Sequence, residues 1–216
     1  MLTVEYYSDV LCVWAWIAQR RIEELVTQFG DQVAVQYRYM DIFGDVDAKM
    51  SGAWSERGGY AGFAEHVLAS AASFDTAPVN PDNWQGNRPR TSGNAHLAIK
   101  AVELASGAPA AAAFARSVRE AFFVEARDVG SLDVLFDVLR SGGLPEAPAR
   151  ELIDSGAAMA ALLGDYQRAA ALKLRGSPSY VMNGERQILY GNVGYRVLSA
   201  NVEELLKQVE HEASWC

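Results

Sequence analysis

The chain has 216 residues, and its content of 50% hydrophobic and 21% charged residues is typical of a globular protein with a substantial core. Its 27 acidic residues outnumber the 19 basic ones and give a formal net charge of −8. This balance argues against nucleic acid or an anionic membrane surface as a partner, because both bind to basic faces. Residues 1–5 lack the basic start and apolar run of a signal peptide, so we expect a cytoplasmic protein.

The N-terminal part of the chain predicts a strand, a helix and a second strand. Residues 2–7 alternate between two faces, which is the period of a strand. Apolar side chains then recur on one helical face over 14–29, and Gly30 is expected to end that helix. Residues 33–40 alternate again. A helical crossover of this length favours parallel pairing of the two strands.

The central part predicts a block of helices. They are expected at 58–73, 95–106, 110–126, 132–141, 147–155 and 157–174. A turn-rich stretch at 75–94 separates the first of them from the others. Close helix packing explains the alanine-rich run at 108–113, because alanine is the best helix former.

The C-terminal part returns to strands. Residues 180–182 and 187–190 flank Asn183 and Gly184, a pair suited to the positive φ angles of a tight hairpin. A last amphipathic helix is expected at 195–211.

This order of elements predicts an α/β fold with one mixed sheet. We expect residues 1–43 and 174–216 to form the sheet layer together. Residues 44–173 are expected to form a helical subdomain that is inserted between the two halves of the sheet.

Cys12 is the strongest candidate for a reactive group. It leaves the end of the first predicted strand and enters the first turn of the helix, where unpaired N–H groups and the helix dipole favour negative charge. Such placement lowers the pKa of a thiol, and we expect Cys12 to alkylate faster than an ordinary cysteine. A buried structural thiol fits the position equally well.

A proline near the start of a predicted strand is a second signal. Pro178 lies between Ser177 and Ser179 and removes a hydrogen-bond donor from the sheet. It therefore requires a sheet edge, a strand start or a cis turn. An ordinary proline at a strand start is the simpler interpretation when this segment is considered alone.

Taken with the order of elements, these two segments resemble the DsbA-like branch of the thioredoxin superfamily. Members of this branch have a cysteine at a helix start, a long helical insertion, and a cis-proline loop before a hairpin and a final helix. Further similar segments lie at 91–97, 121–130 and 180–184. The resemblance implies a thioredoxin-like fold with a large all-helical insertion, in which the Ser177–Pro178 bond is cis and lies close to Cys12.

The motif at the helix start departs from that of the disulfide-exchanging members, which usually read Cys-Pro-Trp-Cys. This chain reads Cys12-Val13-Trp14-Ala15, so Ala15 replaces the resolving cysteine. A mixed disulfide on Cys12 has no neighbouring thiol within the motif to release it.

Four hypotheses remain. In the first, Cys12 exchanges as a monothiol with glutathione or a substrate thiol, and an external thiol resolves the adduct. In the second, the chain resembles 2-hydroxychromene-2-carboxylate isomerases and kappa-class glutathione transferases, which usually carry serine at this position and activate the thiol of glutathione. The third is a redox-silent binding module, and in the fourth the distant Cys216 resolves Cys12. The leading prediction is an enzyme that acts on thiols and disulfides.

The predicted substrate site extends beyond Cys12. Trp14, Ser177, Pro178 and Ser179 are expected to line it. The insertion is expected to complete the cleft, because ligands bind at the carboxyl ends of the strands in open α/β sheets. Its contributors are expected to be Arg88 and Arg90, which can bind carboxylates, and His96.

The expected ligands follow from the same analysis. We expect no tightly bound cofactor, with glutathione as a co-substrate. The histidines lack metal-ligand spacing, so no metal is expected. The expected partners are a small-molecule thiol or a protein thiol or disulfide, and a second copy of the chain in a homodimer.

Overall fold

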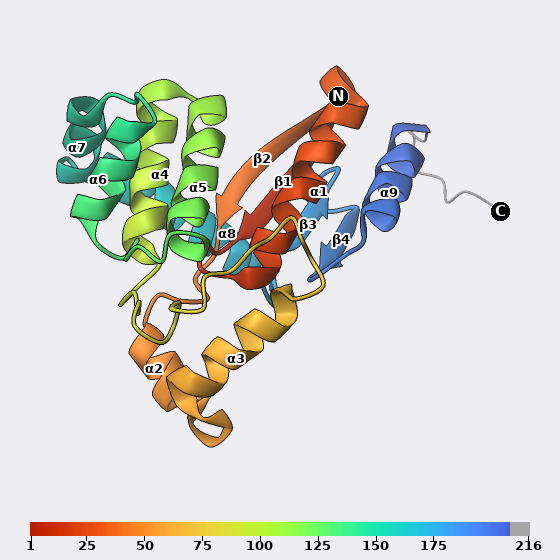
Figure 1. Ribbon diagram of the computed structural model, residues 1–216. Helices are drawn as coiled ribbons and strands as arrows, with labels where there is room; N and C mark the ends of the chain where they lie inside the picture. Colours follow the sequence, from red (N-terminus) through yellow and green to blue (C-terminus); the bar gives the residue numbers. More distant parts are fainter. Residues whose placement is uncertain (208–216) are drawn as a thin grey trace.

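The computed structural model describes residues 1–207, and a four-stranded mixed sheet lies at its centre (Figure 1). The strands are β1 (Leu2–Ser8), β2 (Val33–Tyr39), β3 (Ser179–Met182) and β4 (Gln187–Tyr190). Their order in the sheet is β2-β1-β3-β4. β1 is parallel to β2, whereas β3 is antiparallel to both β1 and β4. The predicted mixed sheet and its parallel crossover are confirmed.

Most of the chain outside the sheet is helical. The helices are α1 (Val13–Phe29), α2 (Val46–Ser51), α3 (Gly59–Ala71), α4 (Gly93–Ser106), α5 (Ala108–Phe123), α6 (Leu132–Ser141), α7 (Glu146–Asp154), α8 (Ala157–Ala171) and α9 (Tyr195–Lys207). Two short 3₁₀ turns lie at Gly30–Gln32 and Ser55–Arg57. Within residues 1–207, no helix has the length and hydropathy needed to cross a membrane.

Helices cover both faces of the sheet. Alternation along β1 sends Val4 and Tyr6 to the face that packs against α1 and α9. Tyr7 points to the opposite face, where it clusters with Val181 of β3 and Ala169 of α8. The carboxyl end of β1 therefore leads into α1 at the edge of a well-packed core.

The chain between β2 and β3 contains every helix from α2 to α8. Helices α4 to α7 form a compact group, and α2 and α3 project separately (Figure 1). The first turns of α1 share a hydrophobic core with this insertion. Trp16 stacks on Phe123, with ring centroids 5.6 Å apart, and its Nε1 donates to the carbonyl of Pro78 (3.0 Å). The insertion is thus anchored one helical turn from Cys12.

Buried charges also tie the insertion to the sheet. Arg38 of β2 and Lys100 of α4 both pair with Asp165 of α8, at 2.9 and 3.0 Å. On β1, Glu5 accepts from Arg168 of α8 (2.7 Å), and this bond holds the pKa of Glu5 below its usual range. The pairing offsets the cost of removing these charges from water.

The structure differs most from the predicted helices at one short element and at two helix ends, whereas the other predicted ends within the described residues agree to within two residues. The six-residue α2 is too short to show a helical period and is absent from the predictions. The helices expected to reach 126 and 174 end at Phe123 and Ala171. Ala126 and Lys173 take left-handed conformations, with φ of 52° and 53°, so neither helix continues through them.

The C-terminal hairpin has the predicted geometry. Asn183 and Gly184 have φ of 49° and 62°. The predicted boundaries at 43 and 174 both fall in loops, the first between β2 and α2 and the second between α8 and β3. The last helix is described to Lys207, and the remainder of its predicted range lies outside the described residues.

Candidate functional site

Cys12 is the residue at which the chain turns from strand to helix. It occupies the N-cap of α1 with extended backbone angles (φ −81°, ψ 117°). Its carbonyl accepts from the amides of Ala15 and Trp16, both at 3.0 Å, and these bonds form the first helical turn. Its own amide donates to the carbonyl of Asp9 (3.1 Å). The predicted placement of Cys12 at a helix N-terminus is confirmed.

The proline loop lies against this cysteine. The Ser177–Pro178 peptide bond is cis. The thiol of Cys12 donates to the carbonyl of Ser177 (3.3 Å), and the hydroxyl of Ser177 accepts from the amide of Asp9 (2.9 Å). These bonds join two segments that are 165 residues apart in the sequence.

Burial decides the acidity of the Cys12 thiol. The side chain is almost fully enclosed, with 7% exposure, and the resulting desolvation raises its pKa above the ordinary value. Hydrogen bonds from the Ser177 side chain and the Ala15 amide oppose this rise, and the nearby charge of Asp9 adds to it. The expectation of a lowered pKa is therefore wrong, because desolvation outweighs the helix-terminal N–H groups.

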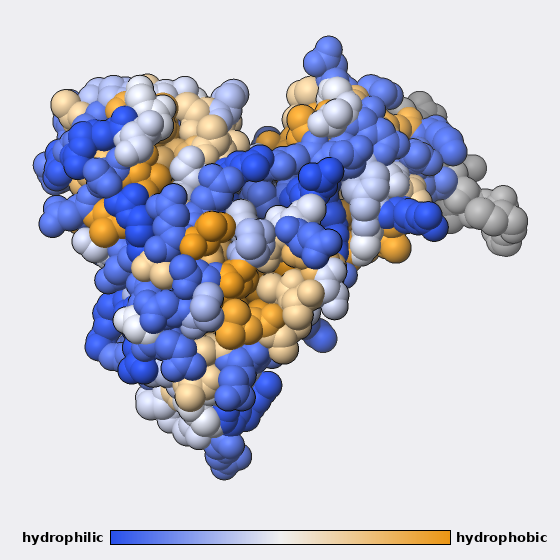
Figure 2. All heavy atoms as spheres, in the orientation of Figure 1, coloured by the Kyte–Doolittle hydropathy of each residue, from blue (hydrophilic) through white to orange (hydrophobic). Residues whose placement is uncertain are grey.

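A cavity of about 320 Å³ opens beside Cys12. Its walls come from the start of α1, the β2–α2 loop, α2, α3 and the proline loop, and its lining residues are Cys12, Val13, Trp14, Ile42, Phe43, Lys49, Trp54, Phe63, His66, Arg175, Gly176 and Ser177. Figure 2 shows hydrophobic surface gathered in the region of α3. The volume falls within the range of small-molecule sites.

The charge of this lining contrasts with the acidity of the whole chain. No lining residue is acidic, whereas Lys49 and Arg175 are cationic. Lys49 lies over the ring of Phe43, with Nζ 4.8 Å from the centroid. Among the described residues, neither cation forms an ion pair with a carboxylate. The lining therefore favours an anionic ligand with an apolar portion.

His66 is a site residue that sequence reasoning missed. It comes from α3, its ring centroid lies 5.1 Å from that of Trp54, and its ring nitrogens make no hydrogen bond to another residue of the described chain. Burial and the charge of Arg57 lower its pKa. Nothing in the local sequence distinguishes His66 from a surface histidine, because Cys12 lies more than fifty positions away.

The structure brings three of the predicted site residues to the cavity, namely Cys12, Trp14 and Ser177. Pro178 and Ser179 are buried behind them, and the Ser179 hydroxyl donates to the carbonyl of Gly176 (2.6 Å). Sequence proximity to Cys12 or to the proline therefore does not ensure access to the cavity.

The two predicted arginines lie elsewhere. Arg88 stacks on Tyr60, with its guanidinium 4.5 Å from the ring centroid, and donates to the carbonyl of Trp84. Arg90 pairs with Asp47 at an exposed position. Neither lines the Cys12 cavity, so the expectation that they form its wall is corrected: local partners already engage both guanidinium groups.

His96 reaches the Cys12 end of the sheet but lies beneath the loop rather than in the cavity. It is fully buried and stacks on Tyr39, with centroids 4.7 Å apart. Its Nε2 accepts from the amide of Val10 (3.1 Å), which leaves the proton on Nδ1 for a hydrogen bond with the hydroxyl of Tyr166 (2.8 Å). Burial lowers its pKa and favours this neutral form. The predicted cleft role is corrected to support of the loop.

Asp9 is the second polar residue beneath the loop. Its buried carboxylate accepts from four donors, which are the amides of Leu11, Ile42 and Phe43 and the hydroxyl of Ser92, at 2.8–3.1 Å. These donors belong to the β1–α1 loop, the β2–α2 loop and the residue before α4. Asp9 thus holds together the three segments that surround Cys12.

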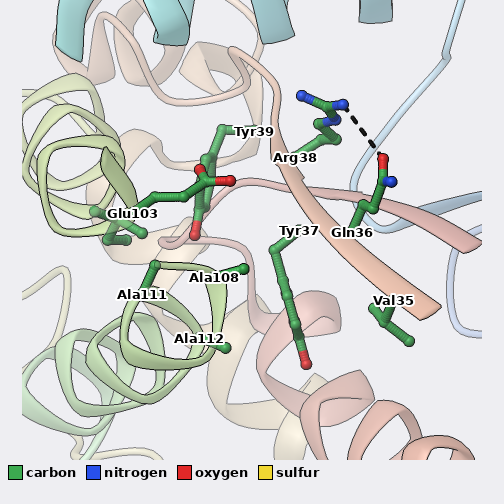
Figure 3. Close-up of a pocket in the computed structure, with 10 residues that line it drawn as sticks. Val35, Gln36, Tyr37, Arg38, Tyr39, Glu103, Ala108, Ala111 and Ala112 are labelled. Carbon is green, nitrogen blue, oxygen red and sulfur yellow. Dashed lines mark hydrogen bonds between the residues drawn. The ribbon is translucent and has the colours of Figure 1, made fainter. Parts of the chain in front are cut away.

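A second cavity of about 300 Å³ lies along the free edge of β2 (Figure 3). Ala108, Ala111 and Ala112 of α5 line one side of it, so part of the alanine-rich run borders a groove as well as packing against helices. Its charged residues already have partners: Glu103 pairs with Lys100 (2.6 Å) and Arg38 with Asp165. This groove shares no lining residue with the Cys12 cavity.

Metal ligation has no support in the described part of the chain. Residues 1–207 contain no group of three or more His, Cys, Asp or Glu side chains placed to hold a metal ion. The fourth hypothesis concerns Cys216, which lies outside the described residues.

A mixed sheet of this topology, with a cysteine at a helix N-cap that is hydrogen bonded to a cis-proline loop, defines a thioredoxin-like protein. The DSBA-like thioredoxin domain family matches residues 3–203, and the chain belongs to that family. The resemblance noted in the sequence is thereby confirmed, as is the thioredoxin-like fold.

Individual relatives are distant. The chain is 24% identical to the ClpXP adapter protein SpxH of Halalkalibacterium halodurans, over 95% of this chain and 68% of that protein. The cytosolic disulfide reductase DsbM of Pseudomonas aeruginosa, solved with GSH, is 22% identical and has a TM-score of 0.69, with 95% and 99% of the two chains covered. A 2-hydroxychromene-2-carboxylate isomerase is 20% identical with a TM-score of 0.62, over 95% and 97%. At these identities the structural likeness establishes the fold.

Proposed function

We propose that the protein is a monothiol oxidoreductase in which Cys12 exchanges with glutathione or a similar small anionic thiol. The Cys12 sulfur attacks one sulfur of glutathione disulfide, the bond between the two glutathione sulfurs breaks, and a mixed disulfide forms on Cys12. The released glutathione takes up the proton that Cys12 gave up. A thiol from solution then attacks the glutathione sulfur of this adduct and forms a new disulfide with it. The bond to the Cys12 sulfur breaks, and the Cys12 thiol is restored.

The observation that carries this proposal is the charge of the Cys12 cavity. In a chain of net charge −8, the cavity beside the only cysteine of the described residues is lined by two unpaired cations and by no acid. Glutathione carries two carboxylates, which Lys49 and Arg175 can bind through charge-assisted hydrogen bonds. The aromatic wall of Trp14 and Trp54 adds apolar contact area.

The lack of a second cysteine in the motif determines how the adduct is resolved. Ala15 cannot resolve an adduct, so resolution requires a second thiol from solution. The raised pKa of Cys12 keeps the free enzyme in its thiol form at neutral pH. Such a site suits the cytoplasm, our proposed location, where glutathione is abundant and thiols stay reduced. The similarity to a disulfide reductase described as cytosolic and solved with GSH supports it.

One observation favours glutathione-dependent isomerase or transferase chemistry as a second candidate. The protonated Cys12 thiol is a hydrogen-bond donor at the helix start, a role that a serine hydroxyl can also fill. In that case Cys12 donates to the thiolate of bound glutathione and forms no covalent adduct. The likeness in fold to a 2-hydroxychromene-2-carboxylate isomerase accompanies this observation.

The test is incubation with glutathione disulfide followed by intact mass measurement and peptide mapping. We expect one glutathione adduct, located on Cys12, which reduced glutathione removes. Cys12→Ser abolishes the adduct, whereas Cys216→Ser, the matched control, leaves formation and removal unchanged. Failure of Cys216→Ser to release its adduct supports resolution by Cys216 instead. Saturable binding of reduced glutathione without any adduct contradicts the proposal and supports the second candidate.

A further inference from the structure

We propose that His66 is the acid–base residue of the Cys12 site: it takes the proton from the attacking thiol and delivers it to the Cys12 sulfur as the mixed disulfide breaks. This inference rests on the proposed monothiol function and assigns a catalytic role within that same site.

The first support is position. His66 and Cys12 come from different elements, α3 and the start of α1, and they line one cavity of about 320 Å³. Phe63, one helical turn before His66, lines the same cavity, so this face of α3 is directed toward it. A ligand that fills this cavity therefore meets both residues.

The second support is the absence of a structural task for the ring nitrogens. The other described histidine of the site region, His96, engages both nitrogens with Val10 and Tyr166. Within the described chain, neither nitrogen of His66 is hydrogen bonded, and its packing partners are the rings of Trp54 and Phe63. Its nitrogens are free to exchange a proton with a ligand.

The charges around His66 favour its neutral, basic form. Arg57, whose guanidinium lies 3.7 Å from the Trp54 ring centroid, acts on its charge, and the cations Lys49 and Arg175 line the same cavity. No carboxylate lines the cavity. Burial and Arg57 lower the pKa of His66, so the ring can accept a proton at neutral pH.

The chemistry of Cys12 makes such a residue useful. In the resolving step a thiol RSH attacks the glutathione sulfur of Cys12–S–S–G, a new RS–SG bond forms, and the bond to the Cys12 sulfur breaks. The proton of RSH moves to His66 and then to the departing Cys12 sulfur, which ends as a thiol. The electron pair of the broken bond stays on that sulfur. A thiol of raised pKa is a poor leaving group as a thiolate, so proton delivery accelerates its departure.

The experiment starts from protein whose Cys12–glutathione adduct is verified by intact mass and freed of excess glutathione disulfide. Reduced glutathione is then added between pH 5 and 9, and the decay of the adduct is followed by mass measurement. We expect a bell-shaped rate profile for the unsubstituted protein: it rises through the pKa of His66 and falls as the glutathione thiol ionises. His66→Gln slows decay about 100-fold at pH 7, and its rate rises only with the thiolate fraction of glutathione.

Two further variants keep the assignment testable. Glu65→Gln changes an exposed neighbour on α3 and is expected to keep the rate and the profile of the unsubstituted protein. His66→Ala is expected to be slow and to regain part of its rate when imidazole is added, a rescue that a purely structural role of His66 does not produce. A His66→Gln or His66→Ala protein that releases the adduct at the unsubstituted rate, with the same bell-shaped profile, overturns the assignment alone. Failure of the unsubstituted protein to form the adduct overturns the proposed function, and the assignment with it.

Discussion

The loop that carries Cys12 has two sides, and their polar groups differ in one respect. Beneath the loop, Asp9 and His96 are fully buried and every polar atom of their side chains has a close polar neighbour. On the cavity side, the side chains of Lys49, His66 and Arg175 have no hydrogen bond or ion pair with the described chain.

This difference separates polar residues that hold the loop in place from polar residues that remain available to a ligand. A buried polar group without a partner costs free energy of folding. A buried cluster in which every polar group is hydrogen bonded is therefore typical of residues that stabilise the fold. Polar side chains that line a cavity without partners are available to a ligand, and the cations among them gain by binding an anion from solution. His96, which the sequence analysis assigned to the ligand, belongs to the first class, and His66, which it did not assign, belongs to the second.

The largest expected effect comes from removing the Asp9 carboxylate beneath the loop. Asp9→Ala leaves three backbone amides, two of them buried, and the buried Ser92 hydroxyl without their acceptor. Since each unsatisfied buried group costs about 1–3 kcal/mol, we expect a loss of about 3 kcal/mol or more in the free energy of unfolding, measured by urea denaturation. Asp41→Ala is the matched control: it removes an exposed carboxylate from the neighbouring loop and is expected to cost less than about 1 kcal/mol. Equal losses of unfolding free energy in the two variants contradict the role assigned to Asp9, which is to hold the three segments around Cys12 together.

The pH dependence of stability is a second test of the buried side of the loop. The pKa of His96 is lowered in the folded protein, so below about pH 6.5 the unfolded chain binds more protons than the folded one. Stability therefore falls as the pH decreases from 7 toward 5, and one such group contributes up to about 1.4 kcal/mol per pH unit. His96→Gln, which keeps an acceptor for the Val10 amide but does not titrate, is expected to flatten this slope in urea denaturation at pH 7, 6 and 5. An unchanged slope in this variant contradicts the neutral, buried state assigned to His96.

The cavity side is tested by removing its two cations. Lys49→Gln with Arg175→Gln is expected to raise the glutathione disulfide concentration for half-maximal adduct formation about tenfold, or about 1.4 kcal/mol. The unfolding free energy is expected to change little, because neither side chain has a carboxylate partner in the described chain. Arg88→Gln with Arg90→Gln removes the same charge outside the cavity and is expected to leave the half-maximal concentration unchanged. The reverse ranking restores the original assignment of Arg88 and Arg90.

The smallest expected effect concerns the pair of Arg90 with Asp47. Both side chains are largely exposed, at 73% and 48%, and exposed ion pairs contribute about 0–1 kcal/mol. Arg90→Gln is therefore expected to lower the unfolding free energy by no more than about 1 kcal/mol, and raised salt is expected to erase the difference. A larger loss that persists in salt shows that Arg90 belongs to the buried, structural class.

Local sequence patterns were sufficient for most of the framework. The alternation in β1 and β2, the apolar face of α1 and the Asn183–Gly184 turn each depend on a few neighbouring residues, and the structure has all of them. The same applies to Cys12 as the N-cap of α1. Even α2 has a local signal, since Asp45 caps it by accepting from the amide of Ala48, although its six residues are too few for a periodic pattern.

The tertiary structure alone decided which polar groups meet the cavity and how acidic Cys12 is. Lys49, His66 and Arg175 approach Cys12 from segments 37 or more positions away, so no local pattern links them. The helix start at Cys12 predicts a lowered pKa, yet burial by surrounding elements raises it. The hydrogen bonds of a helix or a turn join residues that are close in the sequence, so local patterns predict them. Desolvation and the pairing of distant polar side chains depend on how the whole chain packs, which only the folded protein decides.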